Sequence, residues 1–227
     1  MKAVVLLSGG LDSTVCMAFA KSKGYEVYPI SFNYHQRHSI ELKSAKKVAD
    51  FYNVKKHLVI ENNMNEIGGS ALTDKNINIP IGDVNRNDIP VTYVPARNLI
   101  FLSHALGYAE VLGAEYIFIG VNSLDYSGYP DCRPEFINLF QKVADYATKA
   151  TTQDKKQIKI ETPLINLSKK DIVLLGNKLN APLYLTHSCY NGGEKSCGTC
   201  DSCKLRLKGF EEAGIKDPVP YSNCEYK

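Results

Sequence analysis

The hexapeptide Ser8-Gly9-Gly10-Leu11-Asp12-Ser13 has the residue types and the spacing of a phosphate-binding loop. It follows a short apolar run and precedes a helical segment, so the N-terminus of a helix would face the bound anion. The two glycines permit a tight turn and a close approach of backbone N–H groups to phosphate oxygens. The alternative is a plain turn in which Asp12 or Ser13 caps the helix. The position directly after the first strand favours phosphate binding.

The loop lacks the Gly-Lys-Ser/Thr of a Walker loop and the Gly-x-Gly-x-x-Gly of a dinucleotide site. Without that lysine, the loop is expected to hold the β- and γ-phosphates together. We therefore predict that ATP is split at the α-phosphorus and releases pyrophosphate. The residues expected to contact ATP continue into the helix and are Leu7, Ser8, Gly9, Gly10, Leu11, Asp12, Ser13, Thr14, Val15, Cys16 and Met17.

Four of the seven cysteines lie close together near the end of the chain, as Cys189-x7-Cys197-x2-Cys200-x2-Cys203. Four thiolates fill a tetrahedral zinc site completely, which is typical of a structural site with no open position for chemistry. An iron–sulfur cluster is the main alternative, but the proline that follows the last ferredoxin cysteine is absent here. His187 is an alternative ligand. We expect one structural zinc ion per chain.

The elements that must position these residues alternate between strand and helix. Continuous β-branched and leucine runs, amphipathic stripes and capping signals indicate this order. We predict strands at 3–7, 26–34, 56–61, 115–121 and 158–162, and helices at 12–23, 39–52, 98–112, 134–152 and from 168, where Ser168 to Asp171 form a capping box. This alternation predicts an α/β fold with a doubly wound, Rossmann-like parallel sheet.

Two stretches interrupt the alternation, and they suggest how the chain is divided. The connection 62–97 is long and rich in glycine and proline, which is typical of a mobile functional loop. The stretch 186–203 replaces the periodic pattern with cysteines and glycines. We therefore predict an ATP-binding α/β domain at 1–185 and a small zinc-binding region at 186–227.

The amino-acid composition and charge argue against nucleic acid and membrane as binding partners. The net charge of +3 is too small to indicate a nucleic-acid surface and suits a cleft for anionic small molecules equally well. No apolar run approaches the ~20 residues that span a bilayer, and the apolar stretch at the N-terminus is too short for a signal peptide. We expect a cytoplasmic protein that binds neither nucleic acid nor membrane, with its cysteines reduced.

The phosphate loop resembles the signature of the ATP-pyrophosphatase (PP-loop) superfamily, whose fold is adenine nucleotide alpha hydrolase-like. With this loop first and four cysteines last, the whole chain resembles the 7-cyano-7-deazaguanine synthases, the nitrile-forming family of queuosine biosynthesis. Further motifs that carry the resemblance are Tyr93-Val94-Pro95-Ala96-Arg97-Asn98, Gly120-Val121-Asn122, the stretch 125–133 and Cys197-Gly198-Thr199-Cys200.

The resemblance implies a deazaguanine substrate, and the residue types agree with one. Such a base presents N–H donors and needs an acidic acceptor, for which Asp125, Asp131 and Glu135 are candidates near the carboxyl end of a strand. Tyrosine rings suit stacking, and arginine suits a carboxylate or developing phosphate charge. Alternatively, these are ordinary loop residues. The predicted substrate-binding residues are Arg97, Asn98, Asp125, Tyr129, Asp131 and Arg133, and the predicted catalytic residues are Asp12, Ser13 and Arg97.

The implied reaction is an ATP-dependent ligation of 7-carboxy-7-deazaguanine and ammonia to the nitrile, by two adenylations through an amide. Mg²⁺ should accompany ATP, and free ammonia should be the nitrogen donor because position 2 is Lys2 and not the cysteine of an amidohydrolase. The resemblance also implies a homodimer. The alternatives are a PP-loop enzyme that thiolates tRNA with catalytic cysteines and a non-enzymatic zinc-binding module.

Overall fold

The computed structural model describes residues 1–37, 39–83, 88–123 and 129–222. Its centre is a five-stranded sheet in the order β3-β2-β1-β4-β5, and every neighbouring pair of strands is parallel. The strands are β1 Lys2–Leu6, β2 Glu26–Asn33, β3 Leu58–Glu61, β4 Tyr116–Phe118 and β5 Lys159–Glu161. The strand order reverses at β1, with β4 on its other side, which confirms the doubly wound α/β fold.

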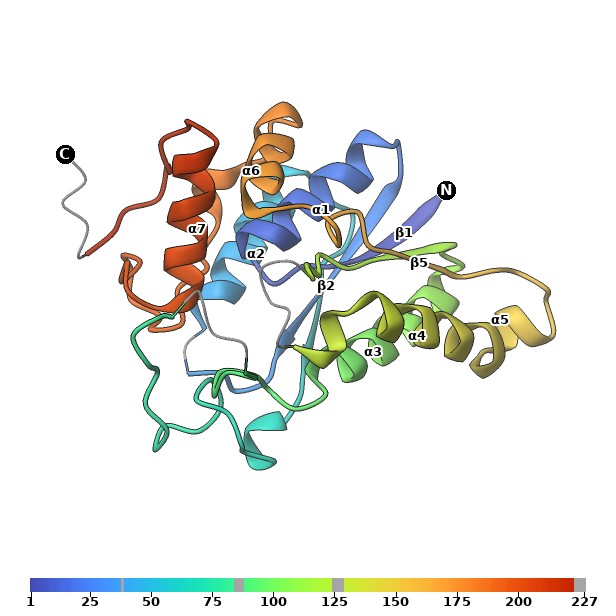
Figure 1. Ribbon diagram of the computed structural model, residues 1–227. Coiled ribbons are helices and arrows are strands. Elements are labelled where there is room, and N and C mark those ends of the chain that lie inside the picture. The colour runs from blue at the N-terminus through green and yellow to red at the C-terminus, as the bar shows by residue number, and fades with distance from the viewer. Residues whose placement is uncertain (38, 84–87, 124–128, 223–227) are drawn as a thin grey trace.

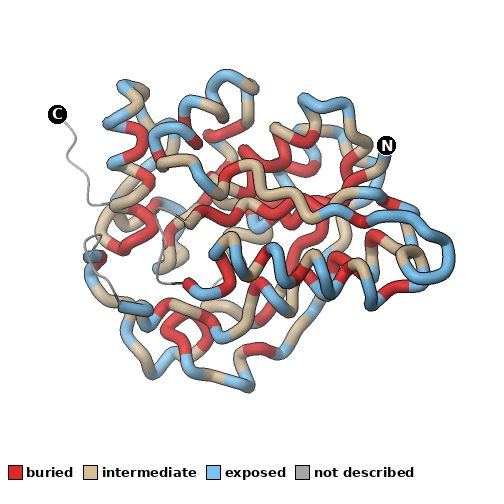
Figure 2. Tube along the Cα trace, turned by 45° about the vertical axis from the view of Figure 1, so that its right-hand side comes forward, coloured by how far each residue is buried: buried red, intermediate tan, exposed pale blue. Residues whose placement is uncertain are grey.

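The buried run at the start of the chain explains why β1 is central. Val4 and Leu6 belong to one hydrophobic core, whereas Ala3 and Val5 belong to a second core on the opposite face of the sheet. Successive residues of a strand point to opposite faces, so a strand buried on both sides must be apolar throughout. Figure 2 shows buried residues along the sheet with exposed residues on the surrounding helices.

Helices cover both faces of the sheet (Figure 1). The first core packs against α3 Arg97–Leu112 and α4 Pro134–Ala147, and the second against α1 Leu11–Ser22, α2 Ile40–Phe51 and α6 Lys169–Lys178. The last helix, α7 Asp201–Glu212, lies against α6, and its Phe210 joins the second core. The predicted boundary near residue 185 stays a prediction about organisation.

The predicted elements differ from the structure in two places. The single helix predicted at 134–152 is wrong, because Thr148 is extended and separates α4 from a short helix α5 Lys149–Thr152 that it caps through its hydroxyl. Helix α7 was not predicted at all. The capping box is confirmed: the Ser168 hydroxyl accepts from Asp171 N at 3.2 Å, and the Asp171 carboxylate accepts from Ser168 N at 3.3 Å.

The described part of the connection 62–97 contains a 3-10 turn, Met64–Glu66, and crosses the cysteine-rich region. Gly82 N donates to Thr199 O at 2.8 Å, and Lys204 Nζ donates to Gly82 O at 2.7 Å. Asp83 N donates to the Asp201 carboxylate at 2.6 Å. These contacts fix the middle of the connection to the start of α7.

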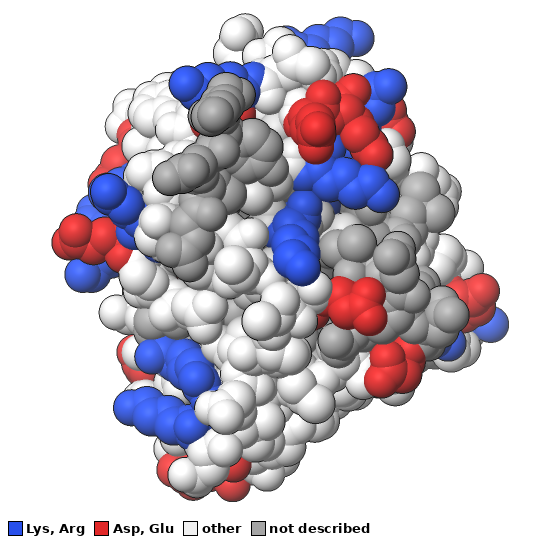
Figure 3. Space-filling model, turned by 60° about the vertical axis from the view of Figure 1, so that its left-hand side comes forward, with Lys and Arg blue, Asp and Glu red and all other residues white. Residues whose placement is uncertain are grey.

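The molecular surface carries mixed charge. On the face shown in Figure 3, lysine and arginine side chains are interspersed with aspartate and glutamate. Among the described residues, no helix is long and apolar enough to cross a membrane.

Candidate active site

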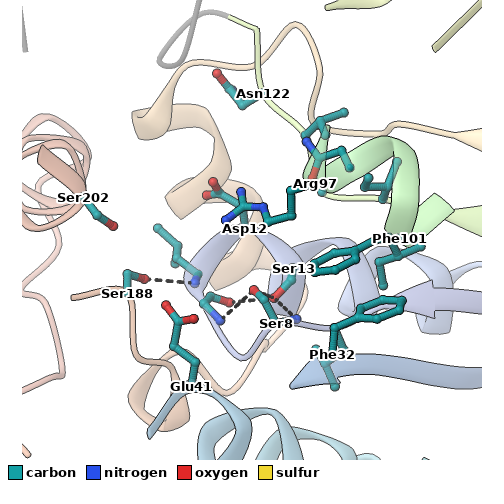
Figure 4. Close-up of a pocket in the computed structure, with 18 of the residues that line it drawn as sticks. Ser8, Asp12, Ser13, Phe32, Glu41, Arg97, Phe101, Asn122, Ser188 and Ser202 are labelled. Atoms are coloured by element: carbon teal, nitrogen blue, oxygen red, sulfur yellow. Dashed lines mark hydrogen bonds between the residues drawn. The ribbon is translucent and has the colours of Figure 1, made fainter. Parts of the chain in front are cut away.

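A cavity of about 230 Å³ opens at the carboxyl ends of the strands, where the strand order reverses. Ligands bind at this edge in doubly wound α/β folds. Its wall includes the end of β1 and the phosphate loop, the ends of β2 and of the segment after β4, and the first turns of α2 and α3 (Figure 4). The phosphate loop and the start of α3, which are distant in sequence, therefore meet in one site.

The Ser13 hydroxyl organises the phosphate loop. It donates to Gly10 O at 3.1 Å and accepts from Ser8 N at 3.2 Å and from the Ser8 hydroxyl at 3.0 Å. The sequence predicts Ser13 as a residue that contacts ATP. Its hydrogen bonds shape the loop and leave the Leu7–Ser8 end of β1 and the Gly10–Leu11 turn around the cavity.

The two glycines of the loop are needed for different reasons. Gly9 has a φ of +88°, and a Cβ there would lie 2.2 Å from Glu41 O and 2.5 Å from Ala45 N of α2. Gly10 has an ordinary φ of −80°, and a Cβ there would meet nothing closer than the Ser8 hydroxyl at 3.5 Å. Packing against α2 therefore requires glycine at position 9, whereas at position 10 only a ligand would require it.

Asp12 pairs with a cation from a distant helix. Lys169 Nζ lies 2.9 Å from both carboxylate oxygens of Asp12, and the lysine side chain is buried. Lys169 is the first residue of α6, and it lines the cavity. The loop lacks a lysine of its own, and α6 places a positive charge beside it.

The segment that leads to the cysteine cluster closes over the loop. His187 N donates to Gly9 O at 2.9 Å, and the Ser188 hydroxyl accepts from Leu11 N at 3.3 Å. Figure 4 shows Ser188 facing the loop from this segment. The conformation of the phosphate loop thus depends on residues directly before Cys189.

The remaining predicted nucleotide contacts lie away from the cavity. Val15, Cys16 and Met17 are fully buried in the second core, where they pack α1 against the sheet. Thr14 is also fully buried, and its hydroxyl has no hydrogen-bond partner among the described residues. None of these four lines the cavity. Helical periodicity explains the result, because only the first turn of α1 faces the site.

Arg97 and Asn98 begin α3 and line the opposite wall of the cavity. Burial by itself would lower the pKa of the Arg97 guanidinium. Tyr34, Tyr129 and Asp131 face it and raise that pKa above its ordinary value. Arg97 therefore stays charged in the site and can meet a carboxylate or a phosphate.

Two of the predicted substrate residues are held by the protein itself. The Asp131 carboxylate accepts from Asn98 N at 2.9 Å and so satisfies a free N–H at the start of α3. The Tyr129 hydroxyl lies 3.1 Å from the Thr92 hydroxyl, and the Tyr129 ring lines the cavity. Asp131 itself does not line the cavity. It places Asn98 and the neighbouring arginine.

A further predicted substrate residue is not brought into the cavity. Arg133 is exposed before α4 and is not part of the wall. Asp125 lies outside the described residues, as do residues 126–128 of the stretch 125–133 that carried the resemblance.

Sequence reasoning missed several residues of the cavity wall. Phe32 and Phe101 stack with ring centroids 3.9 Å apart and an interplanar angle of 4°, and they provide an apolar wall for a flat heterocycle. Glu41 extends from the first turn of α2 toward the loop (Figure 4). Burial raises the pKa of its carboxyl to about 7, against the opposing effects of Arg97 and His187. These side chains come from separate elements, so no local motif marks them.

The four cysteines of the predicted metal site converge. The sulfur atoms of Cys189, Cys197, Cys200 and Cys203 all lie within 4.8 Å of one another, and the Cys197 and Cys203 sulfurs are 3.9 Å apart. Four sulfurs at about 2.3 Å from one tetrahedral ion would be about 3.8 Å apart. Backbone N–H groups of Thr199 and Cys200 donate to the Cys197 sulfur at 3.3 and 3.4 Å, which favours a thiolate there. The cluster has the geometry of a metal site.

The other two described cysteines are poor nucleophiles. Burial raises the pKa of Cys16, which is part of the second core. Burial, together with the charge of Asp131, raises the pKa of Cys132 to about 12, and its sulfur accepts from Asn98 Nδ2 at 3.3 Å. Neither thiol is in the thiolate form that cysteine chemistry needs.

Comparisons with known proteins agree with this geometry. A family model described as "Queuosine biosynthesis protein QueC" matches residues 2–214. "7-cyano-7-deazaguanine synthase 2" of Desulfitobacterium hafniense (strain Y51) is 61% identical over 98% of this chain and 94% of its own length. "7-cyano-7-deazaguanine synthase" of Acetivibrio thermocellus is 60% identical over 97% of each chain.

A structural comparison gives the fold at lower identity. The crystal structure of a predicted subunit of tRNA methyltransferase from Methanocaldococcus jannaschii aligns over 98% of this chain and 94% of its own, with a TM-score of 0.50 and 17% identity. The close relatives and the family match decide the assignment: the chain belongs to the QueC family of 7-cyano-7-deazaguanine synthases of queuosine biosynthesis.

Proposed function

We propose that this chain uses ATP to convert 7-carboxy-7-deazaguanine and ammonia into 7-cyano-7-deazaguanine. The observation that carries the proposal is one cavity, in a member of this family, that combines the phosphate loop, the Arg97 cation and the stacked Phe32 and Phe101 rings. This combination suits a nucleotide, a carboxylate and a flat heterocycle together.

The reaction proceeds in two activated steps. A carboxylate oxygen of the acid attacks the α-phosphorus of ATP, pyrophosphate leaves, and an acyl adenylate forms. Ammonia attacks the acyl carbon, AMP leaves with the C–O bonding electrons, and the amide forms. A second ATP adenylates the amide oxygen, and loss of AMP and of the remaining N–H protons leaves the nitrile. Two oxygens leave carbon, so two ATP molecules are consumed.

The position of each residue in the cavity suggests its role in this reaction. The positive N-terminus of α1 would hold the pyrophosphate, within a loop that Ser13 shapes and in which the Gly10 and Leu11 N–H groups donate to the Ser8 and Ser188 hydroxyls. Asp12 would orient Lys169 toward the phosphates and bind the Mg²⁺ that accompanies ATP. Arg97 would face the carboxylate and the charge that develops on the α-phosphate.

The heterocycle is assigned to the wall near α3. Asn98 and Tyr129 line the cavity there and would contact the ring, and Asp131 would act by placing Asn98. Arg133 and Asp125 remain proposals from the sequence, to be tested by substitution.

We assign the metal site to one structural zinc ion held by all four cysteines. Zinc would fix the fold of the C-terminal segment and take no part in the chemistry, because four thiolates leave no open position. Four thiolates bound to separate irons of a cluster would lie farther apart than thiolates on one ion, so the separation of 3.9 Å favours a single ion.

The alternative function, tRNA thiolation, needs a reactive cysteine and a basic surface. Burial of Cys16 and Cys132 and the engagement of four cysteines in the metal cluster leave no reactive thiol among the described residues. The mixed charge on the face in Figure 3 argues against a broad basic field there.

The homodimer is also a proposal. Leu139, Val143 and Tyr146 are 61%, 50% and 81% exposed and form one stripe along α4, at a spacing that brings them to a single helix face. An apolar stripe of this kind suits contact with a second copy of the chain. Sedimentation of wild type and of Val143→Glu would test it, and two monomeric proteins would contradict it.

Identification of the nucleotide products tests the reaction. Purified protein is incubated with ATP, Mg²⁺, ammonium and 7-carboxy-7-deazaguanine, and quenched samples are separated by chromatography with mass detection. We expect AMP and pyrophosphate, in a ratio of two AMP to each nitrile, and we expect added amide to be converted. ADP and phosphate as the main products would refute adenylation.

A further inference from the structure

A small side chamber adjoins the main cavity. Its volume is about 40 Å³, and it shares five lining residues with the cavity, among them Glu41 and Arg97. Arg37 and Leu72 complete its wall and do not line the main cavity. A single water-sized molecule needs about 10–15 Å³ of such volume. The chamber therefore has room for a few very small molecules and none for a nucleotide or a heterocycle.

Glu41 is the carboxylate that this chamber offers. The described residues that line the main cavity include two carboxylates, Asp12 and Glu41. Both oxygens of Asp12 lie 2.9 Å from Lys169 Nζ, and the proposed function assigns this carboxylate to Lys169 and Mg²⁺. Glu41 faces Arg97 and His187 electrostatically, but no hydrogen-bond donor among the described residues reaches its carboxylate. It is therefore the acceptor that remains open to a ligand.

The charge around the chamber selects among small ligands. Arg37 and Arg97 both line the chamber and disfavour a further cation, whereas the Glu41 carboxylate attracts N–H donors. A neutral molecule with several N–H groups satisfies both. Ammonia has this character and size, and it is the nitrogen donor of the proposed function.

We propose that the side chamber is the ammonia subsite, and that Glu41 hydrogen-bonds ammonia there and accepts protons from the reacting nitrogen. This inference rests on the proposed function. When the nitrogen lone pair forms the C–N bond, the C–O bond to AMP breaks, AMP takes the bonding electrons, and one N–H proton passes to Glu41. In the second step the two amide N–H protons leave nitrogen as the triple bond forms, and the same carboxylate, having released its first proton to solvent, accepts them in turn.

The test separates ammonia chemistry from adenylation. Glu41→Gln keeps the size of the side chain and removes its capacity to accept a proton, and Glu41→Asp restores a shorter carboxylate. Glu211→Gln, on the exposed side of α7 and outside the cavity, is the matched control. Exchange of labelled pyrophosphate into ATP, dependent on 7-carboxy-7-deazaguanine and without ammonium, reports the first adenylation alone. Nitrile formation against ammonium concentration reports the rest.

For Glu41→Gln we expect pyrophosphate exchange within about twofold of wild type and nitrile formation lower by about 100-fold or more, the range of general base catalysis. The KM for ammonium should rise, the KM values for ATP and the acid should stay unchanged, and Glu41→Asp should regain part of the rate. Two results would overturn the subsite. One is a loss of pyrophosphate exchange as large as the loss of nitrile formation. The other is a raised KM for ATP or for the acid while the KM for ammonium is unchanged. Absence of acid-dependent exchange and of nitrile in wild-type protein would instead refute the proposed function.

Discussion

Replacing each glycine of the phosphate loop by alanine separates the packing of the loop from its binding of phosphate. At Gly9, alanine would have to adopt a φ of +88°, and its Cβ would overlap Glu41 O at 2.2 Å and Ala45 N at 2.5 Å. The left-handed conformation costs about 1–2 kcal/mol for a residue with a Cβ. Overpacking against a helix backbone adds about 1–3 kcal/mol. Gly9→Ala should therefore lower the free energy of unfolding by about 2–5 kcal/mol.

Gly10→Ala should have the opposite profile. Position 10 has φ −80° and ψ 172°, and the new Cβ would meet only ordinary contacts from 3.5 Å outward. Loss of glycine from the unfolded chain stabilises such a site by about 0.4–1 kcal/mol. The Cβ would, however, stand where a phosphate oxygen approaches the loop. Loss of one charge-assisted hydrogen bond, about 1.5–3 kcal/mol, would weaken ATP binding about 10- to 150-fold.

The assay pairs thermal unfolding with ATP titration for the two variants. In a chain of this size, about 2–5 kcal/mol corresponds to a fall in Tm of roughly 4–20 °C for Gly9→Ala. Without ligand, Gly10→Ala should have a Tm equal to that of wild type or up to roughly 4 °C higher, and it should lose most of the rise in Tm that ATP gives. An unchanged Tm in Gly9→Ala would refute the contact with α2. Wild-type ATP affinity in Gly10→Ala would refute the phosphate loop itself.

Three further outcomes follow from the site. Asp12→Asn removes the charge that pairs with Lys169 and should reduce nitrile formation about 100-fold or more. Ser13→Ala should reduce it similarly by loosening the loop. Circular dichroism should show that both variants are folded, and wild-type turnover in both would count against these roles. Cys200→Ala should lose its zinc, measured by elemental analysis, and lose stability with it; a brown wild-type protein with bound iron would contradict the zinc assignment. The connection 62–97 should gain protection from hydrogen exchange when ATP and the acid bind, because closing it would exclude water from the adenylate, and unchanged exchange would refute a lid.

The fold could be predicted well where the residues of a single helix or strand carry a clear pattern by themselves. The apolar run before Ser8 identified a strand buried on both faces, and the capping box at Ser168 identified the start of α6. Thr148 broke a helix that its neighbours favoured, because its extended backbone and hydroxyl start a new turn. Helix α7 was missed because Asp201 and Ser202 lie within the cysteine spacing, which indicated a metal site and concealed the helix.

The site could be predicted only where its residues are contiguous. The loop and the four cysteines are local motifs, and the structure brings each set together. Lys169 is 157 residues from Asp12, and that contact depends on how α6 packs beside α1. One local signal did exist. Lys169 and Lys170 lie in the first turn of a helix, where positive charge opposes the helix dipole and so calls for a partner such as Asp12.

The position of the four-cysteine cluster shows how a structural metal ion there would affect catalysis. The segment from Thr186 to Cys200 has no regular secondary structure and so few backbone hydrogen bonds to hold it. Within it, His187 and Ser188 hold Gly9 and Leu11 of the phosphate loop, and Cys189 follows directly. A metal ion that joins Cys189, next to Ser188, to Cys203 in the first turn of α7 would fix both contacts, because it would tie the irregular segment to a helix. Loss of the ion would weaken the contacts of His187 and Ser188 with the phosphate loop. ATP affinity should therefore fall, although no metal ligand lines the cavity.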